Sequence, residues 1–231
     1  MTVRVGVVQF PGTNCELDTV GALSRLGAQA EILWHTRPDV DGVDAVVVPG
    51  GFAYGDYLRA GAIARFSPVM SAISAFAAAG GPVVGICNGF QVLTEAGLLP
   101  GALCRNAGLR FVCATQRIRI ESTGHALGSK LTLGRELDLP VNHFEGNYTC
   151  ERSVLDRLWA DDRVVATYVG NPNGSADDIA GVANENGNVV GLMPHPERAS
   201  SPLLGGDDGN LFFEGLLGFA EAPPQAVAAS G

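Results

Sequence analysis

The chain has 231 residues, 46% of them hydrophobic and 17% charged, which is typical of a compact globular protein and excludes a disordered one. Its formal net charge of -9 argues against binding to nucleic acid or to an anionic membrane surface. We expect no membrane span, because no apolar run reaches ~18 residues, and we expect no signal peptide. The five cysteines form no Cys-x-x-Cys pair, and this usage favours a reducing cytoplasm over a disulfide framework.

The first half of the chain alternates between short apolar runs and helical segments. Each expected helix ends close to a glycine, where a left-handed residue stops a helix. Asn14 and Ser67 stand at the start of two of these helices and are the expected caps. This alternation predicts an α/β fold, with a mostly parallel central sheet and helices on both faces. The strands are expected at residues 3–10, 28–34, 44–48 and 82–86, and the helices at residues 14–26, 67–79 and 88–96.

The second half of the chain has a different pattern, in which apolar and polar residues alternate. Residues 109–121 are typical of a half-exposed antiparallel strand, and residues 164–169 predict another short strand. Residues 179–184 and 189–193 predict a hairpin around an Asn-Gly turn, and a final helix is expected at residues 210–219. We therefore expect antiparallel strands added to the parallel sheet, with one domain over residues 1–222 and a loose tail at residues 223–231.

One cysteine stands in a distinctive local pattern. The segment Gly85-Ile86-Cys87-Asn88-Gly89 follows a buried strand and opens a helix, which is the Gly-x-nucleophile-x-Gly arrangement of a sharp strand-to-helix turn. The glycines let strand and helix pass closely, and the unpaired N–H groups at a helix start favour a thiolate. A buried structural cysteine fits the same position. A base elsewhere in the chain decides between the two interpretations.

A candidate base lies far along the chain, directly after the predicted hairpin. Two prolines fix the backbone on either side of His195, in the segment Pro194-His195-Pro196-Glu197. In an extended segment the side chains of residues two apart lie on one side, so Glu197 can accept from one imidazole nitrogen. The other nitrogen is then free to act on a thiol, as in a catalytic triad. A surface histidine beside a solvated glutamate is the alternative, and the pattern around Cys87 makes the triad the better interpretation.

The two elements together resemble the class I, or triad, glutamine amidotransferases. Further blocks narrow the resemblance to the small glutaminase subunits of phosphoribosylformylglycinamidine synthases, and the similarity spans about residues 3–219. These blocks are residues 10–15, 49–61, 145–148 and 193–198, of which the block at 49–61 is the most specific. The resemblance implies a flavodoxin-like sheet. This chain has His143-Phe144-Glu145-Gly146 where the family usually has His-Gly-Glu-Gly, and Phe144 bears on the backbone geometry of that loop.

The resemblance implies a triad of Cys87, His195 and Glu197. Cys87 would attack the side-chain amide carbon of glutamine, and His195 would move the proton to the departing nitrogen. Glu197 would orient His195 and stabilise its cationic form. Water would then cleave the glutamyl thioester and release glutamate.

The resemblance also implies groups that hold the substrate. Backbone N–H groups of Gly51 or Phe52 and of Asn88 would stabilise the oxyanion, although Gly50-Gly51 is equally natural as a tight turn after a strand. Gln91 would help to hold the α-amino acid end of glutamine, and an exposed polar residue on a first helical turn is the alternative. No histidine shows metal-ligand spacing with the cysteines, so we expect no metal site.

Free ammonia is a poor end product, and the resemblance implies partners that use it. These are a large synthetase subunit, which uses Mg-ATP to convert formylglycinamide ribonucleotide to formylglycinamidine ribonucleotide in purine synthesis, and in bacteria a third small subunit. No phosphate-binding Gly-x-x-x-x-Gly-Lys-Ser/Thr loop occurs in this chain, so we expect no cofactor of its own. Residues 54–61 and 11–14 are candidates for the partner interface, with an ordinary surface loop as the alternative.

Three other functions fit parts of the sequence. Intracellular α/β proteases or chaperone-like proteins share the cysteine turn, but they lack a His-Pro-Glu element after a late hairpin. A non-catalytic regulatory subunit would have a damaged triad, and here all three residues are present. A glutaminase subunit of another biosynthetic pathway is the remaining alternative, and the block at residues 49–61 ranks it second.

Overall fold

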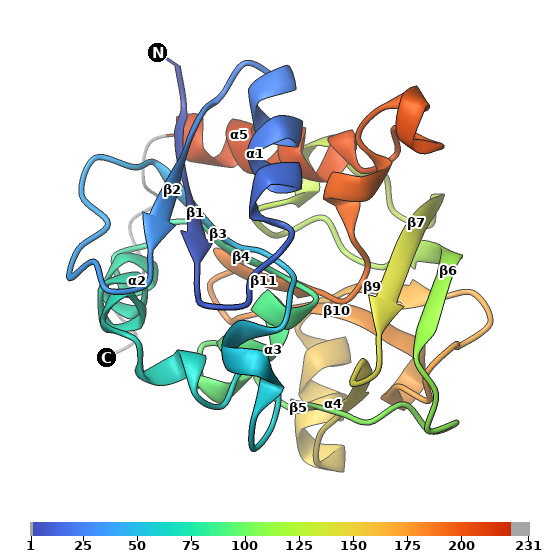
Figure 1. Cartoon of the computed structure of the whole chain (residues 1–231). Helices are drawn as coiled ribbons and strands as arrows, with labels where there is room; N and C mark the ends of the chain where they lie inside the picture. The colour runs from blue at the N-terminus through green and yellow to red at the C-terminus, as the bar shows by residue number, and fades with distance from the viewer. Residues whose placement is uncertain (1, 223–231) are drawn as a thin grey trace, which may run out of the picture.

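The computed structural model describes residues 2–222, and the tail expected at residues 223–231 lies outside this range (Figure 1). A nine-stranded sheet forms the centre of the molecule. Its strand order is β2-β1-β3-β4-β11-β10-β9-β6-β7, and a separate two-stranded sheet pairs β5 (Ala102–Cys104) with β8 (Asn147–Thr149). Within the described range, no helix has both the length and the apolar character needed to cross a bilayer.

The sheet has a parallel half and an antiparallel half, as the sequence predicts. The parallel strands are β1 (Arg4–Gln9), β2 (Gln29–Trp34), β3 (Ala45–Val48), β4 (Val83–Ile86) and β11 (Val189–Leu192). The strands β10 (Ile179–Ala183), β9 (Val164–Tyr168), β6 (Val112–Ile120) and β7 (Glu136–His143) extend the sheet by antiparallel pairing. Every residue of β3, β4 and β11 is buried, because helices cover both faces of a parallel sheet.

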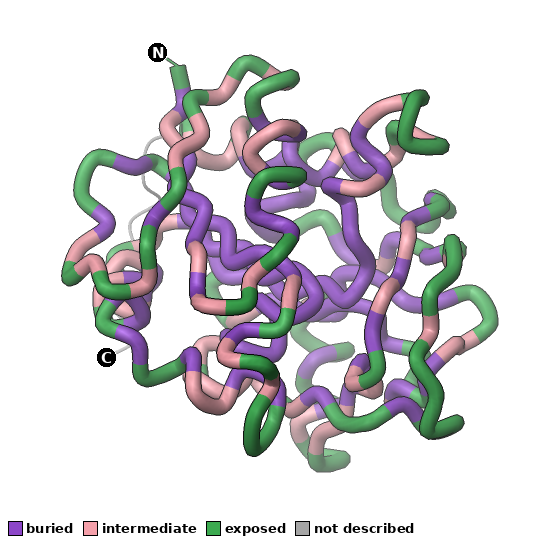
Figure 2. Tube along the Cα trace, in the orientation of Figure 1, coloured by how far each residue is buried: buried purple, intermediate pink, exposed green. Residues whose placement is uncertain are grey.

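Helices flank the parallel half on its two faces (Figure 1). One face carries α1 (Glu16–Arg25) and α5 (Asn210–Glu221), which touch each other. The other carries α2 (Pro68–Ala78) and α3 (Asn88–Glu95), while α4 (Arg152–Ala160) lies beside the antiparallel half. Buried residues follow the strands through the middle of the molecule, and exposed ones follow the outer loops (Figure 2). The sheet is therefore the core on which the site is built.

The helix ends differ in detail from the expected ones. α1 begins one residue after Cys15, and Asn14 does not cap it; the Asn14 side chain instead accepts a hydrogen bond from the Cys15 thiol at 3.2 Å. Ser67 does precede α2, with a proline in the first turn, but its hydroxyl bonds the Tyr54 hydroxyl at 2.9 Å rather than the helix. Tertiary partners have therefore replaced the local caps.

Four elements were not expected from the sequence: α4, β5, β7 and β8. In β7, Leu137, Leu139 and Val141 alternate with polar residues, so the pattern was present, but Pro140 argues against a central strand. The structure reconciles the two, because β7 is the last strand of the sheet. The nitrogen and the carbonyl of Pro140 both point to the free edge of β7, away from β6. Pairing with β6 therefore does not need the N–H that proline lacks, and no ladder bond is lost.

The free edge of β7 returns to the middle of the molecule. The Pro140 carbonyl accepts a hydrogen bond from the N–H of His195 at 2.8 Å, and the Asn142 carbonyl accepts one from the Cys87 thiol at 3.7 Å. Cys87 follows β4 and His195 follows β11, which are central strands. The antiparallel half therefore curls until its last strand lies against the carboxyl ends of the parallel strands, where ligands bind in such sheets.

Candidate active site

Cys87 sits on a strained turn between β4 and α3. Its backbone has φ 50° and ψ -106°, a conformation that residues with side chains rarely adopt. A side chain at Gly89 would overlap the Val48 carbonyl, and one at Gly85 would come within 2.7 Å of the Gly89 backbone. The steric reason for both glycines is thus confirmed. The strained turn holds Cys87 at the N-terminus of α3, where the helix dipole favours a negative charge.

His195 and Glu197 form a buried pair. Nδ1 of His195 donates to Oε1 of Glu197 at 2.5 Å, and the two side chains are 2% and 0% exposed. The geometric reason differs from the expected one, because residues Pro196–Ala199 form a 3-10 turn rather than an extended segment. The turn bends the carboxylate back to the ring. Since Nδ1 serves Glu197, Nε2 is the nitrogen left for chemistry.

The surroundings of His195 favour its charged form. Burial opposes that form, but the Glu197 carboxylate and then the Cys87 and Cys15 thiols outweigh burial, so the pKa of His195 lies well above its ordinary value. Nε2 is buried and has no hydrogen-bond partner among residues 2–222. Cys87 is near enough to affect the ring, yet its thiol donates to Asn142. The structure thus brings all three predicted triad residues together.

The loop after β3 passes directly beside the triad. A side chain at Gly50 would come within 2.7 Å of Cε1 of His195, so glycine is required there. The N–H of Phe52 donates to the Gly12 carbonyl at 2.9 Å and is not free for an oxyanion. The N–H of Gly51 makes no hydrogen bond within the described range. The sequence left Gly51 and Phe52 as alternatives for the first oxyanion donor, and in the structure only the N–H of Gly51 is available.

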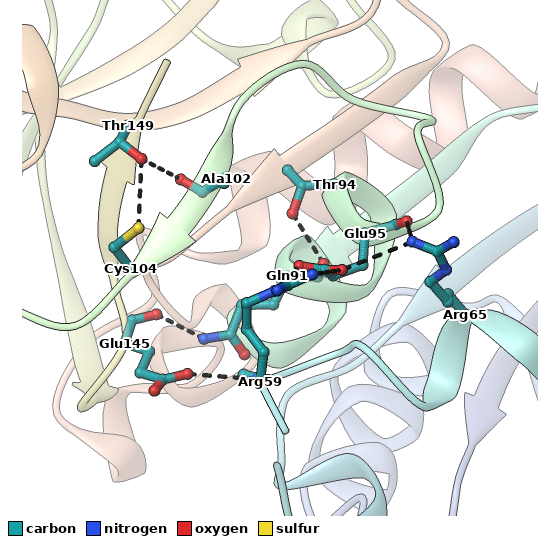
Figure 3. A network of polar contacts seen from close by, with 10 residues as sticks. Arg59, Arg65, Gln91, Thr94, Glu95, Ala102, Cys104, Glu145 and Thr149 are labelled. Carbon is teal, nitrogen blue, oxygen red and sulfur yellow. Dashed lines mark hydrogen bonds and ion pairs between the residues drawn. The ribbon is translucent and has the colours of Figure 1, made fainter. Parts of the chain in front are cut away.

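Asn88 and Gln91 tie the start of α3 to two loops. Asn88 accepts from the Ala53 N–H at 3.0 Å, and its amide donates to Oε1 of Gln91 at 2.8 Å. Gln91 is 5% exposed and donates to the Glu145 carbonyl at 2.6 Å (Figure 3). Gln91 is therefore not an exposed polar residue, and both ends of its side chain bind the protein. Its amide nitrogen holds the loop that carries Glu145, and its oxygen accepts from Asn88 of the same helix.

Arginine side chains fasten the loop after β3 to the far end of α3. Arg59 makes two hydrogen bonds to the Glu95 carboxylate, and Arg65 donates to the Glu95 carbonyl at 3.0 Å (Figure 3). The N–H of Ala60 also faces the Glu145 carboxylate at 3.4 Å. This loop is thus anchored on both sides of the helix, although Leu58 at its tip is 93% exposed.

The loop between β7 and β8 is held from behind by buried amides. Asn106 is 1% exposed, and its amide donates to the carbonyls of His143 and Arg110 at 3.0 and 2.9 Å. Asn173 donates to the Gly146 carbonyl at 2.8 Å. Phe144 does not have a positive φ. A side chain at this position is therefore tolerated, and the departure from the family pattern leaves the loop intact.

Sequence reasoning missed the place of two residues near the triad, Cys15 and Tyr168. Cys15 is 1% exposed and accepts a hydrogen bond from Arg198 at 3.2 Å. Tyr168 is buried, and its hydroxyl has no partner within the described part of the chain. Burial and the nearby Cys87 raise the pKa of Tyr168. No motif signals these residues, because they reach the site from two distant segments, before α1 and at the end of β9.

One group of possible metal ligands occurs in the described range. Ligand atoms of Cys15, His195 and Glu197 lie within 4.8 Å of one another, and all three residues are buried. Spacing could not reveal this group, because its members come from opposite ends of the chain. The atoms of His195 and Glu197 already bond each other, so a metal would displace the proton between them. The absence of a metal site stays a prediction.

Comparisons with known proteins show which family the chain is similar to. Residues 2–204 match the model of the CobB/CobQ-like glutamine amidotransferase domain. The phosphoribosylformylglycinamidine synthase subunit PurQ of Rubrobacter xylanophilus is 59% identical over 219 residues, which are 95% of this chain and 100% of the relative. The same subunit of Frankia casuarinae is 55% identical over 222 residues, with 95% of each chain covered.

A solved structure matches the fold as well. A chain in the structure of PurLQS from Thermotoga maritima is 39% identical, with a TM-score of 0.88, and the match covers 96% of this chain and 100% of that chain. The domain match covers residues 2–204, and the high identity extends over 95% of the chain. The chain belongs to the glutamine amidotransferase family of phosphoribosylformylglycinamidine synthase PurQ subunits.

Proposed function

We propose that this chain hydrolyses glutamine to glutamate and ammonia with Cys87, His195 and Glu197, as the glutaminase subunit of phosphoribosylformylglycinamidine synthase. One observation carries the proposal. A buried His195 gives one nitrogen to Glu197, and its other nitrogen has no partner among residues 2–222 and lies beside a cysteine on a strained turn. Nucleophile, base and orienting carboxylate are the parts that amide cleavage through a thioester requires.

The reaction proceeds in two halves. Cys87 attacks the carboxamide carbon as a thiolate, and the protonated His195 gives its Nε2 proton to the departing nitrogen, which leaves as ammonia. Water, deprotonated by Nε2, then attacks the glutamyl thioester and releases glutamate. Glu197 stabilises the charged imidazole in both halves. This role is in line with the raised pKa of His195, which burial opposes and to which Glu197, then Cys87 and Cys15, contribute.

The oxyanion of each tetrahedral intermediate is held by backbone donors. We assign this role to the N–H groups of Gly51 and Asn88. Asn88 is the first residue of α3, so its N–H has no partner inside the helix. Losing one such donor typically costs about 10²–10³ in rate. Gln91 contributes by holding the Glu145 loop against the helix, and its contact with the α-amino acid end of glutamine remains part of the proposal.

The ammonia passes to partner subunits in the cytoplasm. We propose a large synthetase subunit that uses Mg-ATP on formylglycinamide ribonucleotide, together with a third small subunit; this chain needs no cofactor of its own. The exposed tip of the loop after β3, at Tyr57 and Leu58, is the proposed contact with the synthetase. These side chains are 74% and 93% exposed, so their apolar surface is available to a partner.

The proposal is tested by measuring glutamate release from glutamine. The chain is assayed alone and with the synthetase, ATP and formylglycinamide ribonucleotide. Cys87→Ala should lower kcat by about 10⁴-fold or more, because the residues of a triad act as one unit. Cys113→Ala is the matched control, since Cys113 is exposed on β6, and it should leave the rate unchanged. Leu58→Glu should weaken the complex without lowering the melting temperature.

Two results would contradict the proposal. A complex that forms but never hydrolyses glutamine means that the chain is a regulatory subunit. Hydrolysis that persists in Cys87→Ala means that another nucleophile operates. Formation of the amidine product, by contrast, supports the assignment to purine synthesis over a glutaminase for another pathway.

A further inference from the structure

His143 is a buried histidine that the proposed triad chemistry does not use. It is the last residue of β7 and is 3% exposed. Nδ1 lies 3.2 Å from Oδ1 of Asn106, which also accepts the N–H of Gly146 at 3.0 Å. Because the Asn106 amide nitrogen donates elsewhere, this oxygen is the acceptor and Nδ1 carries the proton. Nε2 then has only a lone pair to offer.

That lone pair has no partner in the part of the chain that the structure describes. Nε2 of His143 is buried and makes no hydrogen bond to any residue in the range 2–222. Buried polar groups are nearly always paired, and an unpaired one costs stability. The ring is held tightly in this orientation, since a side chain at Gly146 would overlap it. An acceptor kept rigid, buried and unpaired is suited to a ligand that donates a hydrogen bond.

The position of His143 points to the substrate. The residue before it, Asn142, contacts the Cys87 thiol with its carbonyl, and Glu145 accepts from Gln91 with its own. The backbone of residues 142–145 therefore runs along the first turn of α3, beside the nucleophile. Burial, and then the charge of His195, lower the pKa of His143 to about 4. At neutral pH the lone pair is thus present in full.

We propose that Nε2 of His143 accepts a hydrogen bond from the carboxamide N–H of bound glutamine and then from the departing ammonia. This inference rests on the proposed function. The oxyanion donors donate hydrogen bonds to the carboxamide oxygen, and protonated His195 gives a proton to the carboxamide nitrogen. Neither of them accepts a hydrogen bond from the nitrogen. His143 supplies that acceptor and so distinguishes an amide, which has N–H groups, from an ester, which has none.

Two matched variants test this role against a purely structural one. Gln at position 143 can place an acceptor near the position of Nε2, whereas Asn can keep the contact with Asn106 but cannot reach as far. Each variant is assayed with glutamine and with glutamic acid γ-methyl ester, in the synthetase complex where the chain alone is inactive. The measured quantity is kcat/KM for glutamate release, which reports formation of the thioester.

We expect His143→Asn to lose roughly 10- to 100-fold in kcat/KM for glutamine, as expected for a substrate N–H left unpaired. His143→Gln should retain much more of this activity, and neither variant should change ester hydrolysis beyond about 3-fold, a change of less than 1 kcal/mol in the barrier. If amide and ester activities fall together, or if Asn substitutes as well as Gln, the inference is wrong and His143 only supports the loop. If wild type hydrolyses the ester but never glutamine, the proposed function fails instead.

A second measurement needs no variant of His143. The chain has four histidines, so the ¹⁵N signals of a histidine-labelled Cys87→Ala protein can be assigned individually. Addition of glutamine should shift the Nε2 signal of His143 upfield, because the ¹⁵N signal of an unprotonated ring nitrogen moves upfield when that nitrogen accepts a hydrogen bond. The γ-methyl ester should cause no such shift. A His143 signal that responds equally to both compounds, or to neither while glutamine binds, contradicts the inference.

Discussion

Individual side chains near the site are held under electrostatic strain, and Asp56 is the clearest case. Burial, and then the charge of Glu145, raise the pKa of Asp56 to about 6, although Asn88 opposes the shift by donating to its carboxylate. An acid with a raised folded-state pKa binds more protons when folded than when unfolded. The free energy by which ionised Asp56 destabilises the folded state therefore grows as pH rises from about 4 to about 6. Above that range it stays at its full value.

We expect Asp56→Asn to stabilise the protein at neutral pH. Asparagine keeps an oxygen that can accept from Asn88 but removes the charge facing Glu145. The gain should be about 1 kcal/mol in the free energy of unfolding at pH 7.5, because solvent screening reduces the effect at a partly exposed group. Chemical denaturation at pH 7.5 and pH 4 checks this, since the gain should shrink towards zero at the lower pH. An equal gain at both pH values would mean that the charge is not its cause.

The turn between β4 and α3 is the element on which the site depends. Its two glycines are required by close backbone contacts and not by a positive φ, because neither Gly85 nor Gly89 is in the left-handed region. The carbonyl that faces Gly89 belongs to Val48 in β3, and a strand of a packed sheet cannot move aside. Any side chain at Gly89 must therefore displace the helix that carries Cys87.

Gly89→Ala should lower the free energy of unfolding by about 3 kcal/mol or more and abolish glutamine hydrolysis. Gly206→Ala is the matched control, because a side chain there meets no atom within 4 Å and Gly206 has no positive φ. Gly206→Ala should change the free energy of unfolding by no more than about 0.5 kcal/mol. Urea denaturation of both variants measures the difference. Equal stability of the two would show that the turn relaxes more easily than its contacts indicate.

At the scale of the whole molecule, buried neutral histidines make the fold sensitive to acid. Burial lowers the pKa of His125 to about 4, although its hydrogen bond to the Ser122 carbonyl opposes the shift. In the unfolded chain the His125 side chain binds a proton near pH 6.5, whereas in the folded chain it does so only near pH 4. Stability must therefore fall as pH drops through this window, by up to about 3 kcal/mol for this residue.

We expect His125→Gln to flatten the pH dependence of unfolding between pH 6.5 and pH 4. The slope should decrease by up to about 1.4 kcal/mol per pH unit, the value for one proton. His35→Gln serves as a control, because His35 is less buried and should change the slope less. Denaturation at constant ionic strength across this range measures both slopes. An unchanged slope in His125→Gln would mean that carboxylates alone cause the acid sensitivity.

Much of the fold could be predicted because it follows from local patterns. Apolar runs such as Ala45–Val48 and the glycines that end the helices mark β-α alternation directly. The candidate triad could be predicted for the same reason, since the turn at Cys87 and the Pro-flanked His195 are short motifs. The hairpin of β10 and β11 also follows from local turn chemistry. In each case the residues that form the signal are close in sequence or share one period.

The sequence by itself determined which residues can carry the chemistry, and the tertiary structure decided which of them meet. Only the curl of the antiparallel half brings the free edge of β7 to Cys87 and His195. Only the packed fold places Cys15 beside His195 and leaves Nε2 of His143 buried without a hydrogen-bond partner in residues 2–222. The physical reason is that such contacts join segments far apart in the chain, and they depend on the summed twist and packing of the whole sheet, which no local pattern records.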